Sequence, residues 1–453
     1  MRIGFSTETH RRNTVRLAAA AALAAAAIPA ALAGGTFIKG SFGFDPIEES
    51  AIVGSLPADA PFLLPAGFSQ EVVWDEKGLF SSGPDFYATQ PCVPDMNQSN
   101  ETGKWAGRFL YRTHEVRAAL DLDGDGVREG PYGSLSVTDL ETGETKLLVQ
   151  RADWEALDGL KWTPWGTLLF AEEVITSAFP DADAPQADCG LLYELALDPK
   201  DPSTAVSVTV RPAVGSVSHE GIAIDSAGDL YTIDEFASGS IYRFTPDRRG
   251  DLSSGQLYAL EVVGFDFADY NPSDGDATID ARTGAARWVP LDRTQSQINA
   301  RVAAQAANGT PYGRPEDLEI VDGVLYAAIT SENCVLSIDL KGKDPFVRLF
   351  VKSGRNVPVE SSSVTGLDNP DNLAIDSHGN VYVIEDNSPG DIWCATPDKD
   401  GDGLADAVVL FASLSTPGSE PTGLYFGKDP KVAFVNVQHA SSGNDMTIAI
   451  RKE

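Results

Sequence analysis

The sequence predicts an all-β fold in which one hairpin unit recurs along the chain. The unit is clearest at residues 366–386, where a turn containing Gly379 joins two short apolar runs and the second run ends on Glu385 and Asp386. Runs rich in β-branched and aromatic residues on both sides of a glycine turn are typical of a β-hairpin. The 42 Gly and 28 Pro among 453 residues fit one large all-β domain with many turns.

Five further copies of the unit predict the architecture. They lie at residues 107–115, 158–173, 220–235, 316–330 and 423–439, and strand-like runs follow the copies. Repeats of roughly 40 to 60 residues, each with three or four strands, are typical of a β-propeller. The alternative is a β-sandwich with chance hairpins, but sandwiches do not repeat in register. We therefore expect a six-bladed β-propeller.

The first 33 residues are typical of an export signal. A basic stretch precedes an alanine-rich apolar run, and Ala31-Leu32-Ala33 matches a cleavage site. The run is too short and too weakly hydrophobic for a stable membrane span. Arg11-Arg12 is a weak twin-arginine match. The sequence therefore predicts a secreted or periplasmic protein and leaves the export route open.

The mature chain is expected to have two parts. Residues 34–104 form an N-terminal arm with loops, the stretch 79–104 being loop-like, and residues 105–453 form the propeller. An insertion at about 264–312 contains an alanine-rich stretch, Asp292–Ala307, which is the best helix candidate in the chain. An insertion of this size is expected to lie over one face of the propeller.

Charge and cysteine content exclude several classes. The formal charge of −32, from 66 acidic and 34 basic residues, argues against binding to nucleic acid or to an anionic membrane. The excess acid fits a cation-binding protein or a surface adapted to high salt. Four widely spaced cysteines without a C-x-x-C motif allow one or two disulfides and do not suggest a zinc site.

The repeats carry acidic residues at matching positions. An acid opens the first strand of four copies, and fourteen residues later a pair of acids closes the second strand in three of them. These two positions lie at the same edge of an antiparallel hairpin, and the first strands surround a propeller axis, so we expect the acids to converge at one mouth of the channel. Clustered carboxylates need compensating cations, and oxygen ligands suit Ca²⁺, Mn²⁺ or Fe³⁺. The alternative is a set of exposed turn carboxylates. The predicted metal ligands are Asp158, Glu172, Glu220, Glu316, Asp371 and Glu385, with Glu115 and Glu420 as weaker candidates.

Two Asp-Gly loops, at residues 121–126 and 398–403, share the D-x-D-x-D-G core of a calcium loop. Neither loop has an acid at the twelfth position, so neither is an EF-hand. Each is either a structural Ca²⁺ site or an Asp-Gly-rich turn that binds nothing. The predicted calcium ligands are Asp121, Asp123, Asp125, Asp398, Asp400 and Asp402.

Arg314 lies two residues before Glu316 and is the candidate catalytic residue. A guanidinium suits bidentate binding of phosphate beside a metal centre, although it could equally form a salt bridge that orients Glu316. His219 and His439 are candidate ligands or general acids, with a structural role as the alternative.

Five motifs, taken together, resemble one family. In chain order they are Thr163-Pro-Trp-Gly-Thr167, His219-Glu220-Gly221, Arg314-Pro-Glu316, Pro370-Asp371-Asn372 and Phe434-Val-Asn-Val-Gln-His439. In this order they resemble the secreted PhoX-type alkaline phosphatases. That resemblance implies a six-bladed propeller with Ca²⁺ and Fe³⁺ bridged by an oxo group at the channel mouth, and export by the twin-arginine route. It implies that Glu220, Glu316 and Asp371 ligate metals and that Arg314 binds the phosphoryl group.

Two positions depart from the family pattern. Asp158 stands where the family has an iron-ligating cysteine, so the resemblance implies iron less directly than calcium. Thr113-His114-Glu115 is a variant of the family's Asn-His-Glu. The sequence predicts a secreted, monomeric, metal-dependent phosphomonoesterase that acts on small phosphate esters. The alternatives are a propeller lactonase or sugar dehydrogenase, and a non-catalytic binding propeller stabilised by calcium.

Overall fold

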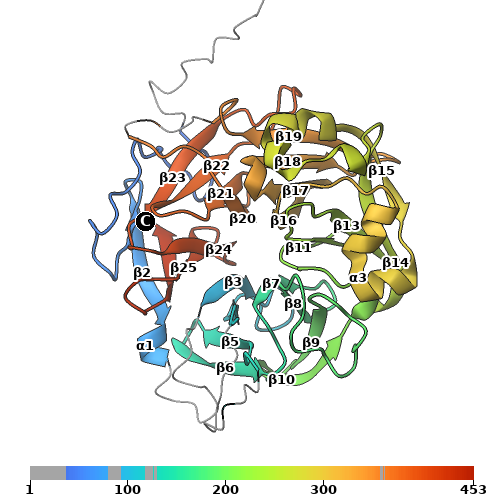
Figure 1. Ribbon diagram of the computed structural model, residues 1–453. Helices are drawn as coiled ribbons and strands as arrows, with labels where there is room; N and C mark the ends of the chain where they lie inside the picture. Colours follow the sequence, from blue (N-terminus) through green and yellow to red (C-terminus); the bar gives the residue numbers. More distant parts are fainter. Residues whose placement is uncertain (1–36, 80–92, 118–125, 127–129, 358–360, 362) are drawn as a thin grey trace, which may run out of the picture. The chain divides into compact units, whose positions relative to one another are not determined.

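The strands lie in sets of four around a common centre (Figure 1). The computed structural model describes residues 37–79, 93–117, 126, 130–357, 361 and 363–453, and residues 35–453 form one compact unit. The innermost strands contact one another in a closed cycle. In cyclic order they are β3 (Pro94–Ser99), β7 (Leu157–Trp162), β11 (Ile222–Ile224), β16 (Pro315–Val321), β20 (Pro370–Ile375) and β24 (Glu420–Phe426). The predicted all-β propeller fold is confirmed.

Each inner strand begins an antiparallel set that continues outward. After β3 come β4 (Phe109–His114), β5 (Ser134–Asp139) and β6 (Glu144–Gln150). After β7 come β8 (Leu168–Glu172), β9 (Leu192–Asp198) and β10 (Asp201–Val210). After β11 come β12 (Leu230–Ile233), β13 (Ile241–Arg248) and β14 (Asp251–Val262). After β16 come β17 (Val324–Ile329), β18 (Cys334–Asp339) and β19 (Phe346–Lys352). After β20 come β21 (Val381–Glu385), β22 (Gly390–Ala395) and β23 (Val408–Leu414). Strand β15 (Gly284–Pro290) joins β14 to β19 in one nine-stranded sheet, so the count of six blades stays a prediction from the repeats.

The N-terminal arm contributes outer strands. The last set continues with β25 (Val432–Gln438) and β26 (Met446–Lys452), and its outermost strand is β2 (Phe68–Asp75), which pairs with β26. Strand β1 (Phe62–Leu63) pairs with β23. Figure 1 shows the blue β2 beside the red strands of the C-terminal end. The last set is thus built from both ends of the chain.

The loop predicted over residues 79–104 was wrong at β3. Its sequence, Pro-Asp-Met-Asn-Gln-Ser, has neither the apolar alternation nor the β-branched residues of an ordinary strand. The polar side chains are buried because the strand is innermost and has neighbours on both faces. Tertiary packing therefore decides the conformation of this segment.

The repeated hairpin turns are set by one aspartate and one glycine. Asp225 Oδ1 accepts hydrogen bonds from the backbone N–H groups of Ala227 (2.9 Å), Gly228 (2.9 Å) and Asp229 (2.9 Å). Gly228 has φ +95°, a conformation that favours glycine. Asp376 and Gly379 (φ +77°) repeat the arrangement between β20 and β21.

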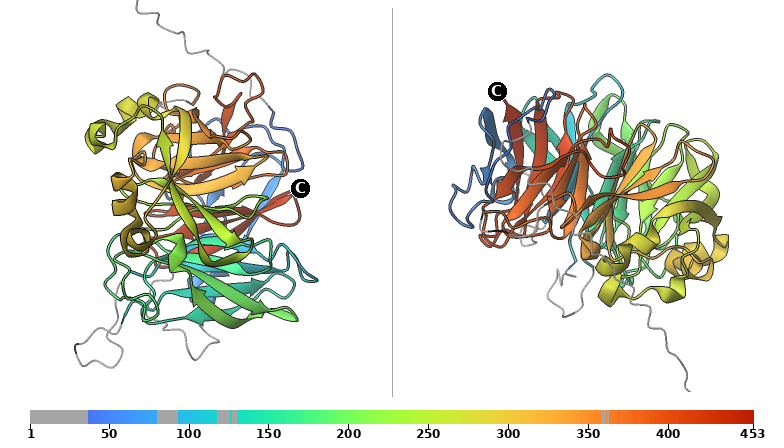
Figure 2. Two further views of the ribbon diagram at one scale, coloured as in Figure 1. Left: turned by 90° about the vertical axis from the view of Figure 1, so that its right-hand side faces the viewer. Right: turned by 90° about the horizontal axis from the view of Figure 1, so that it is seen from above.

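The insertion contains the longest helix among the described residues, and this helix is kinked at Asn299, whose φ of −159° and ψ of 101° are not helical. Helix α3 (Arg293–Ala306) confirms the predicted helix, and Asp292 caps it by accepting hydrogen bonds from the N–H groups of Thr294 and Gln295. Shorter helical turns precede it at Phe267–Asp269, Pro272–Asp274, α2 (Gly275–Thr278) and Ile279–Arg282. In the left view of Figure 2 these helical segments lie together along one side of the sheets. Two other short 3-10 helices are Pro212–Val214 and Thr330–Glu332, and α1 is Glu76–Leu79.

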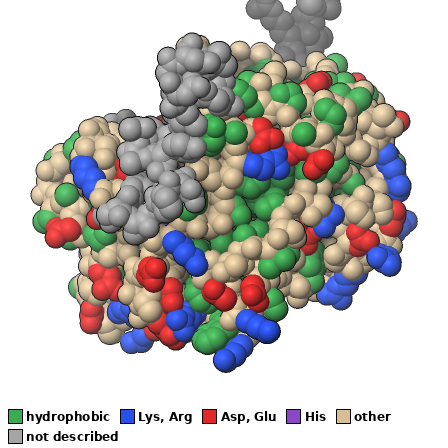
Figure 3. Space-filling model, turned by 90° about the horizontal axis from the view of Figure 1, so that it is seen from below, with side chains coloured by type: hydrophobic (Ala, Val, Ile, Leu, Met, Phe, Trp, Pro, Cys, Tyr) green, Lys and Arg blue, Asp and Glu red, His purple; other side chains and the backbone are tan. Residues whose placement is uncertain are grey.

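Three of the four cysteines lie in the packed interior. Cys189, Cys334 and Cys394 are buried and free, so no disulfide forms among these three, whereas Cys92 lies outside the described residues. No described helix has the length and apolar character needed to cross a membrane. The face drawn in Figure 3 carries acidic and basic side chains interspersed. The excess acid is therefore not gathered into a single patch on that face.

Candidate metal centre and active site

Every inner strand carries an acidic residue near its first residue. Because the inner strands start at the same end of the sheets, this position recurs around the centre, and we call these residues the inner ring. Four were predicted as principal ligands, Glu420 was a weaker candidate, and Asp95 was missed. The inner ring consists of Asp95, Asp158, Glu220, Glu316, Asp371 and Glu420.

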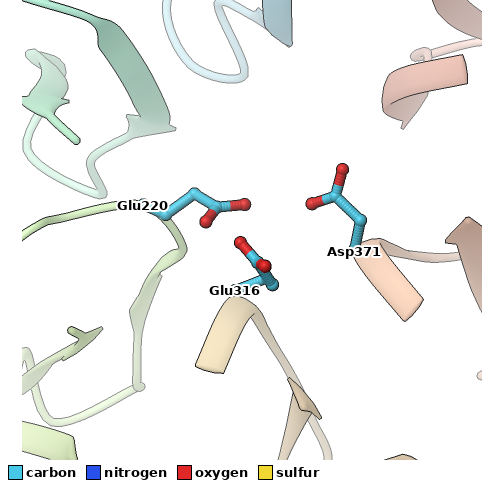
Figure 4. Close-up of side chains that lie close together, drawn as sticks. All are labelled: Glu220, Glu316 and Asp371. Carbon is cyan, nitrogen blue, oxygen red and sulfur yellow. The ribbon is translucent and has the colours of Figure 1, made fainter. Parts of the chain in front are cut away.

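Three members of the inner ring form a compact cluster. Carboxylate oxygens of Glu220, Glu316 and Asp371 all lie within 4.8 Å of one another. Figure 4 shows the three side chains pointing toward one another from separate inner-strand ends. Burial, and then the charge of Glu316, raises the pKa of Glu220 and that of Asp371 well above their usual ranges. The structure thus brings together three residues that the repeat register selected.

Asp158 and Asp95 extend the cluster. Burial, followed by the charges of Asp95 and Glu115, raises the pKa of Asp158 well above its usual range, and Oδ1 of Asp158 is buried without a hydrogen-bond partner. Nε2 of Gln438 donates to Asp95 Oδ2 (3.1 Å) and to Glu115 Oε2 (3.1 Å) and so ties these two carboxylates together. Burial also raises the pKa of Asp95, and Glu115 adds to the effect.

Glu420 meets the cluster from the last set of strands. Burial, with a hydrogen bond to Asp386, raises the pKa of Glu420 to about 11, and Asp371 and Asp95 contribute to the shift. His439 Nε2 lies 3.5 Å from Glu420 Oε1. The weaker candidate Glu420 therefore belongs to the same group of interacting carboxylates as the predicted ligands.

A second group, which we call the outer ring, follows the second strand of each set. It starts one or two residues after that strand ends and faces the same centre. Three of its carboxylates were not selected from the sequence, namely Glu173, Glu235 and Asp386. The outer ring consists of Glu115, Glu173, Glu235, Thr330, Asp386 and His439.

The two acids that close each second strand have opposite orientations. Side chains alternate between the two sides of a strand, so adjacent residues cannot both face the centre. Glu172 Oε1 accepts a hydrogen bond from the N–H of Glu155 (3.1 Å), and its Oε2 accepts one from the N–H of Leu191 (3.2 Å). Burial raises the pKa of Glu172 to about 8, and the hydrogen bonds from the N–H groups of Glu155 and Leu191 oppose that shift. Glu172 therefore lies inside the set of strands, whereas Glu173 interacts electrostatically with Glu115, Glu235 and Asp158.

Glu385 repeats the orientation of Glu172. Its Oε1 accepts hydrogen bonds from the N–H of Asp368 (3.0 Å) and from Nε1 of Trp393 (2.8 Å). Asp386, the next residue, is the one that interacts with Glu420. The structure brings neither predicted ligand of this kind, Glu172 or Glu385, to the cluster, and it brings their C-terminal neighbours instead.

Arg314 bridges the two rings. Its Nε donates to Glu235 Oε1 (2.6 Å), and its Nη2 lies 2.9 Å from Glu316 Oε1. The side chain remains 42% exposed, so it is accessible from the mouth. Burial lowers the pKa of Arg314, but the carboxylates of Glu316 and Glu235 outweigh burial and raise it above its usual range. The predicted salt bridge to Glu316 is present, and it leaves the guanidinium at the surface of the carboxylate cluster.

Arg117 is a second arginine at the cluster, which the sequence did not single out. Its Nε donates to Glu115 Oε1 (2.6 Å), its Nη1 donates to the carbonyl of Glu173 (3.2 Å), and its Nη2 pairs with the Glu173 carboxylate. Asp158 also interacts electrostatically with Arg117. Arg117 and Arg314 therefore each neutralise an adjacent part of the rings.

The histidines differ in position. His219 is fully buried, and its Nε2 lies 3.1 Å from the carbonyl oxygen of Gly215. Burial lowers the pKa of His219 to about 4, so the side chain is neutral at pH 7. His439 has φ +61° and lies at the mouth beside Glu420. A structural role fits His219, whereas His439 is accessible to a bound ligand.

The second Asp-Gly loop forms a small acidic group of its own. Oxygens of Asp398, Asp400 and Asp406 lie within 4.8 Å of one another. Asp402, a predicted ligand, is not in this group, and its Oδ1 accepts from the N–H of Leu404 (2.8 Å). Both Asp398 oxygens accept backbone N–H groups of the loop. The three aspartates of the first loop, Asp121, Asp123 and Asp125, lie outside the described residues.

The rings together suit hard cations. Ten carboxylates face two arginines and one histidine, and Asp158 Oδ1 and Glu220 Oε2 are buried without partners. Buried carboxylates that remain ionised require neutralising charge, and an all-oxygen donor set favours Ca²⁺ or another hard ion. The residues present therefore fit a site for several cations.

Asp95 shares a local sequence feature with two other inner-ring acids. Proline directly precedes the acid at Pro94-Asp95, Pro315-Glu316 and Pro370-Asp371. Proline lacks an N–H and is confined to strand starts or edges, so it suits the first residue of an inner strand. The dipeptide alone is not specific, because it also occurs away from the inner strands, at Pro180-Asp181 and Pro246-Asp247. For Glu173, Glu235 and Asp386 the missing step was the alternation of side chains along the strand.

The chain is similar to known proteins of one enzyme family. A family model described as alkaline phosphatase PhoX matches residues 161–441, more than half of the chain. Among solved structures, the chain is similar to Pseudomonas fluorescens PhoX in complex with vanadate, a transition state analogue, at 17% identity and a TM-score of 0.64 over 91% of this chain and 98% of that chain. It is also similar to a gluconolactonase from Xanthomonas campestris, at 12% identity and a TM-score of 0.46 over 90% of this chain and 100% of that chain. No curated protein sequence matches the chain. The likeness at 17% identity supports the fold.

Proposed function

The chain belongs to the PhoX alkaline phosphatase family and is thus a phosphoric ester hydrolase. We propose that it depends on metal ions and hydrolyses small phosphate monoesters at the carboxylate rings. The observation that carries this proposal is the cluster of Glu220, Glu316 and Asp371, whose carboxylate oxygens lie within 4.8 Å of one another beside Arg314. A phosphate dianion is repelled by the carboxylates of the two rings unless bound cations reverse the negative charge of the rings. Metal binding and phosphate binding are therefore linked at this site.

We propose that the inner ring holds the cations. Glu220, Glu316 and Asp371 are the ligands best supported by geometry, and Asp95, Asp158 and Glu420 complete the donor set. When bound, the cations would supply positive charge to neutralise the phosphate oxygens and to lower the pKa of an attacking water. Ca²⁺ fits these oxygen donors, and Fe³⁺ fits Asp158, because a carboxylate is a hard ligand where the family has a cysteine.

In this proposal Arg314 binds the phosphoryl group. Its guanidinium is fixed by Glu235 on one side and by Glu316 on the other, so it is oriented before substrate arrives. An arginine in a fixed orientation suits phosphate because its planar N–H donors match two phosphate oxygens. It would stabilise the charge on the equatorial oxygens during in-line displacement. Glu235, one of the missed residues, would therefore act as a positioning residue.

The outer ring would support the inner ring. Arg117 neutralises Glu115 and Glu173 and so reduces the number of cations that the cluster requires. His439, next to Glu420 at the mouth, is the candidate to donate a proton to the leaving group. Glu172 and Glu385, predicted as ligands, would instead hold the backbone of their strand ends through the hydrogen bonds described above.

Export and a further calcium site complete the proposal. Members of this family are secreted or periplasmic, and the features of residues 1–33 support removal of an export signal by a signal peptidase. Asp398 and Asp400, with Asp406 in place of Asp402, are candidate ligands of a structural Ca²⁺. We propose a monomer, because nothing in the sequence calls for an obligate partner.

The proposal is tested by exchanging one ring carboxylate and one matched carboxylate on the same strand. Glu316→Gln should lower kcat/KM for p-nitrophenyl phosphate by at least ~100-fold and lower the bound metal. Glu319→Gln removes the ion pair of Glu319 with Lys161 (2.7 Å) on the same strand β16 and should leave both unchanged. Full metal content and full turnover in Glu316→Gln would refute the assignment of the site. Metal-dependent melting of the wild type without turnover would favour a non-catalytic binding propeller.

A further inference from the structure

The conformation of Arg314 requires support. Its φ is +52°, in the left-handed region that a non-glycine residue adopts only when the surrounding structure imposes it. The backbone N–H of Arg314 donates to the carbonyl of Phe236 (2.9 Å), and its carbonyl accepts from the N–H of Thr330 (2.9 Å). These partners lie on two different segments, and each segment is held in turn by an arginine of the insertion.

The first arginine is Arg282, at the end of a short helical turn. Its Nη1 donates to Glu332 Oε1 (2.6 Å), and both side chains are essentially unexposed. The same Glu332 oxygen accepts the backbone N–H of Gly313 (2.9 Å), the residue that precedes Arg314. Nη1 and Nη2 of Arg282 also donate to the carbonyls of Pro311 (3.0 Å) and Gly275 (2.6 Å). Arg282 therefore fixes the chain directly before Arg314.

The second arginine is Arg301, in helix α3. Its Nε and Nη2 each donate to one oxygen of Asp234 at 2.6 Å, and Asp234 is fully buried. The guanidinium carbon of Arg301 also lies 3.9 Å from the ring centroid of Phe236. Asp234, Glu235 and Phe236 are consecutive, so Arg301 fixes the segment that holds Arg314. In that segment the Glu235 carboxylate and the Phe236 carbonyl accept hydrogen bonds from Arg314. Bidentate pairs of this kind restrict orientation as well as position.

We infer that the insertion is a brace for the phosphate-binding arginine, with Arg301 and Arg282 as positioning residues. Arg301 acts through Asp234, Glu235 and Phe236, and Arg282 acts through Glu332 and Gly313. This inference rests on the proposed role of Arg314. Packing alone would not require buried ion pairs at these positions, because hydrophobic residues of similar size could fill the same space. Positioning of Arg314 explains why ion pairs are present.

The test compares conservative variants of three arginines of the insertion. Both lysine variants keep the charge. Arg301→Lys loses the bidentate pair with Asp234, and Arg282→Lys loses the separate N–H donors that reach Glu332, Pro311 and Gly275. Arg287→Lys is the control. Arg287 also belongs to the insertion and forms a bidentate pair with Glu261 of β14 (2.5 and 2.9 Å), and among the described residues it has no hydrogen bond to the groups that hold Arg314. Each variant is measured for KM and kcat with p-nitrophenyl phosphate, for inhibition by inorganic phosphate, for metal content and for melting temperature.

We expect Arg301→Lys and Arg282→Lys to raise KM and the inhibition constant for phosphate by about tenfold, with metal content unchanged and a smaller change in kcat. Arg287→Lys should leave both constants unchanged. In an Arg314→Ala background, Arg301→Lys should have no further effect on kcat/KM, because residues that act as a unit are not additive.

The inference is overturned if Arg314→Ala impairs the enzyme but the two lysine variants keep wild-type constants, or if Arg301→Lys has its full effect in the Arg314→Ala background. Loss of activity that tracks only a fall in melting temperature, equally in the Arg287→Lys control, would also overturn it. If Arg314→Ala itself keeps full activity, the role proposed for Arg314 fails first.

Discussion

Removal of either of the two neighbouring glutamates at the end of β8 should have opposite effects on stability and on activity. Glu172 faces the interior of its strand set, where it accepts the N–H groups of Glu155 and Leu191, whereas Glu173 faces the centre and pairs with Arg117. Glu172→Ala should therefore lower stability and leave the specific activity of the folded protein near that of the wild type. Glu173→Ala should leave stability nearly unchanged and alter metal binding and turnover.

The magnitudes follow from the hydrogen bonds. In Glu172→Ala the N–H of the buried Leu191 loses an acceptor, which costs about 1–3 kcal/mol, and the half-buried N–H of Glu155 costs less. With the lost packing of the side chain, the free energy of unfolding should fall by about 2–4 kcal/mol. In Glu173→Ala the partner Arg117 is 54% exposed and keeps Glu115, so the change should stay below about 1 kcal/mol.

Both variants should be unfolded in urea with excess Ca²⁺, so that ligand binding does not differ between samples. Turnover of p-nitrophenyl phosphate, normalised to folded protein, and metal content are measured alongside. The reasoning is refuted if Glu172→Ala loses metal and activity while its stability is unchanged, because Glu172 would then face the centre. Equal effects of the two substitutions on stability and on activity would also refute the claim that the two side chains face opposite sides of the strand.

Three further predictions concern the charge of the rings. Without metal, Glu420 has a folded pKa of about 11 against an ordinary value of 4.5, so between these pH values the folded state binds more protons than the unfolded state. The free energy of unfolding of the chelated protein should therefore fall as pH rises from about 5 to about 9. A rise or no change in urea unfolding would contradict this. Arg117→Gln removes the cation between Glu115 and Glu173 and should tighten Ca²⁺ binding ~10-fold, equivalent to ~1.4 kcal/mol, in calorimetric titration, whereas weaker binding would contradict it. Asp158→Cys should raise the iron content per chain, because a thiolate favours transition metals over calcium, and an unchanged iron-to-calcium ratio would count against Asp158 as a ligand.

The parts of the site that the sequence predicted are those set by the repeat. Glu220, Glu316 and Asp371 open successive inner strands, and one residue spacing within a repeated hairpin locates all three. The helix at Arg293–Ala306 was also predicted, because alanine content is a local property of the chain.

The parts that were missed depend on side-chain orientation or on contacts between sets. Predicting Glu172 in place of Glu173 is an error of one residue, and one residue reverses the side of the strand. Asp95 lies on a strand whose polar sequence is stabilised by its neighbours rather than by its own propensity. Arg117 joins Glu115 of one set to Glu173 of the next, a contact that no local pattern encodes.

The central claim is that hard cations in the carboxylate rings make this chain a phosphatase. It is tested most directly by elemental analysis of protein purified without added metal, with p-nitrophenyl phosphate turnover measured before and after chelation. We predict bound calcium with iron, turnover that chelation abolishes, and recovery when the metals are returned. Metal-free protein with undiminished turnover, or fully loaded protein without turnover, would contradict the account.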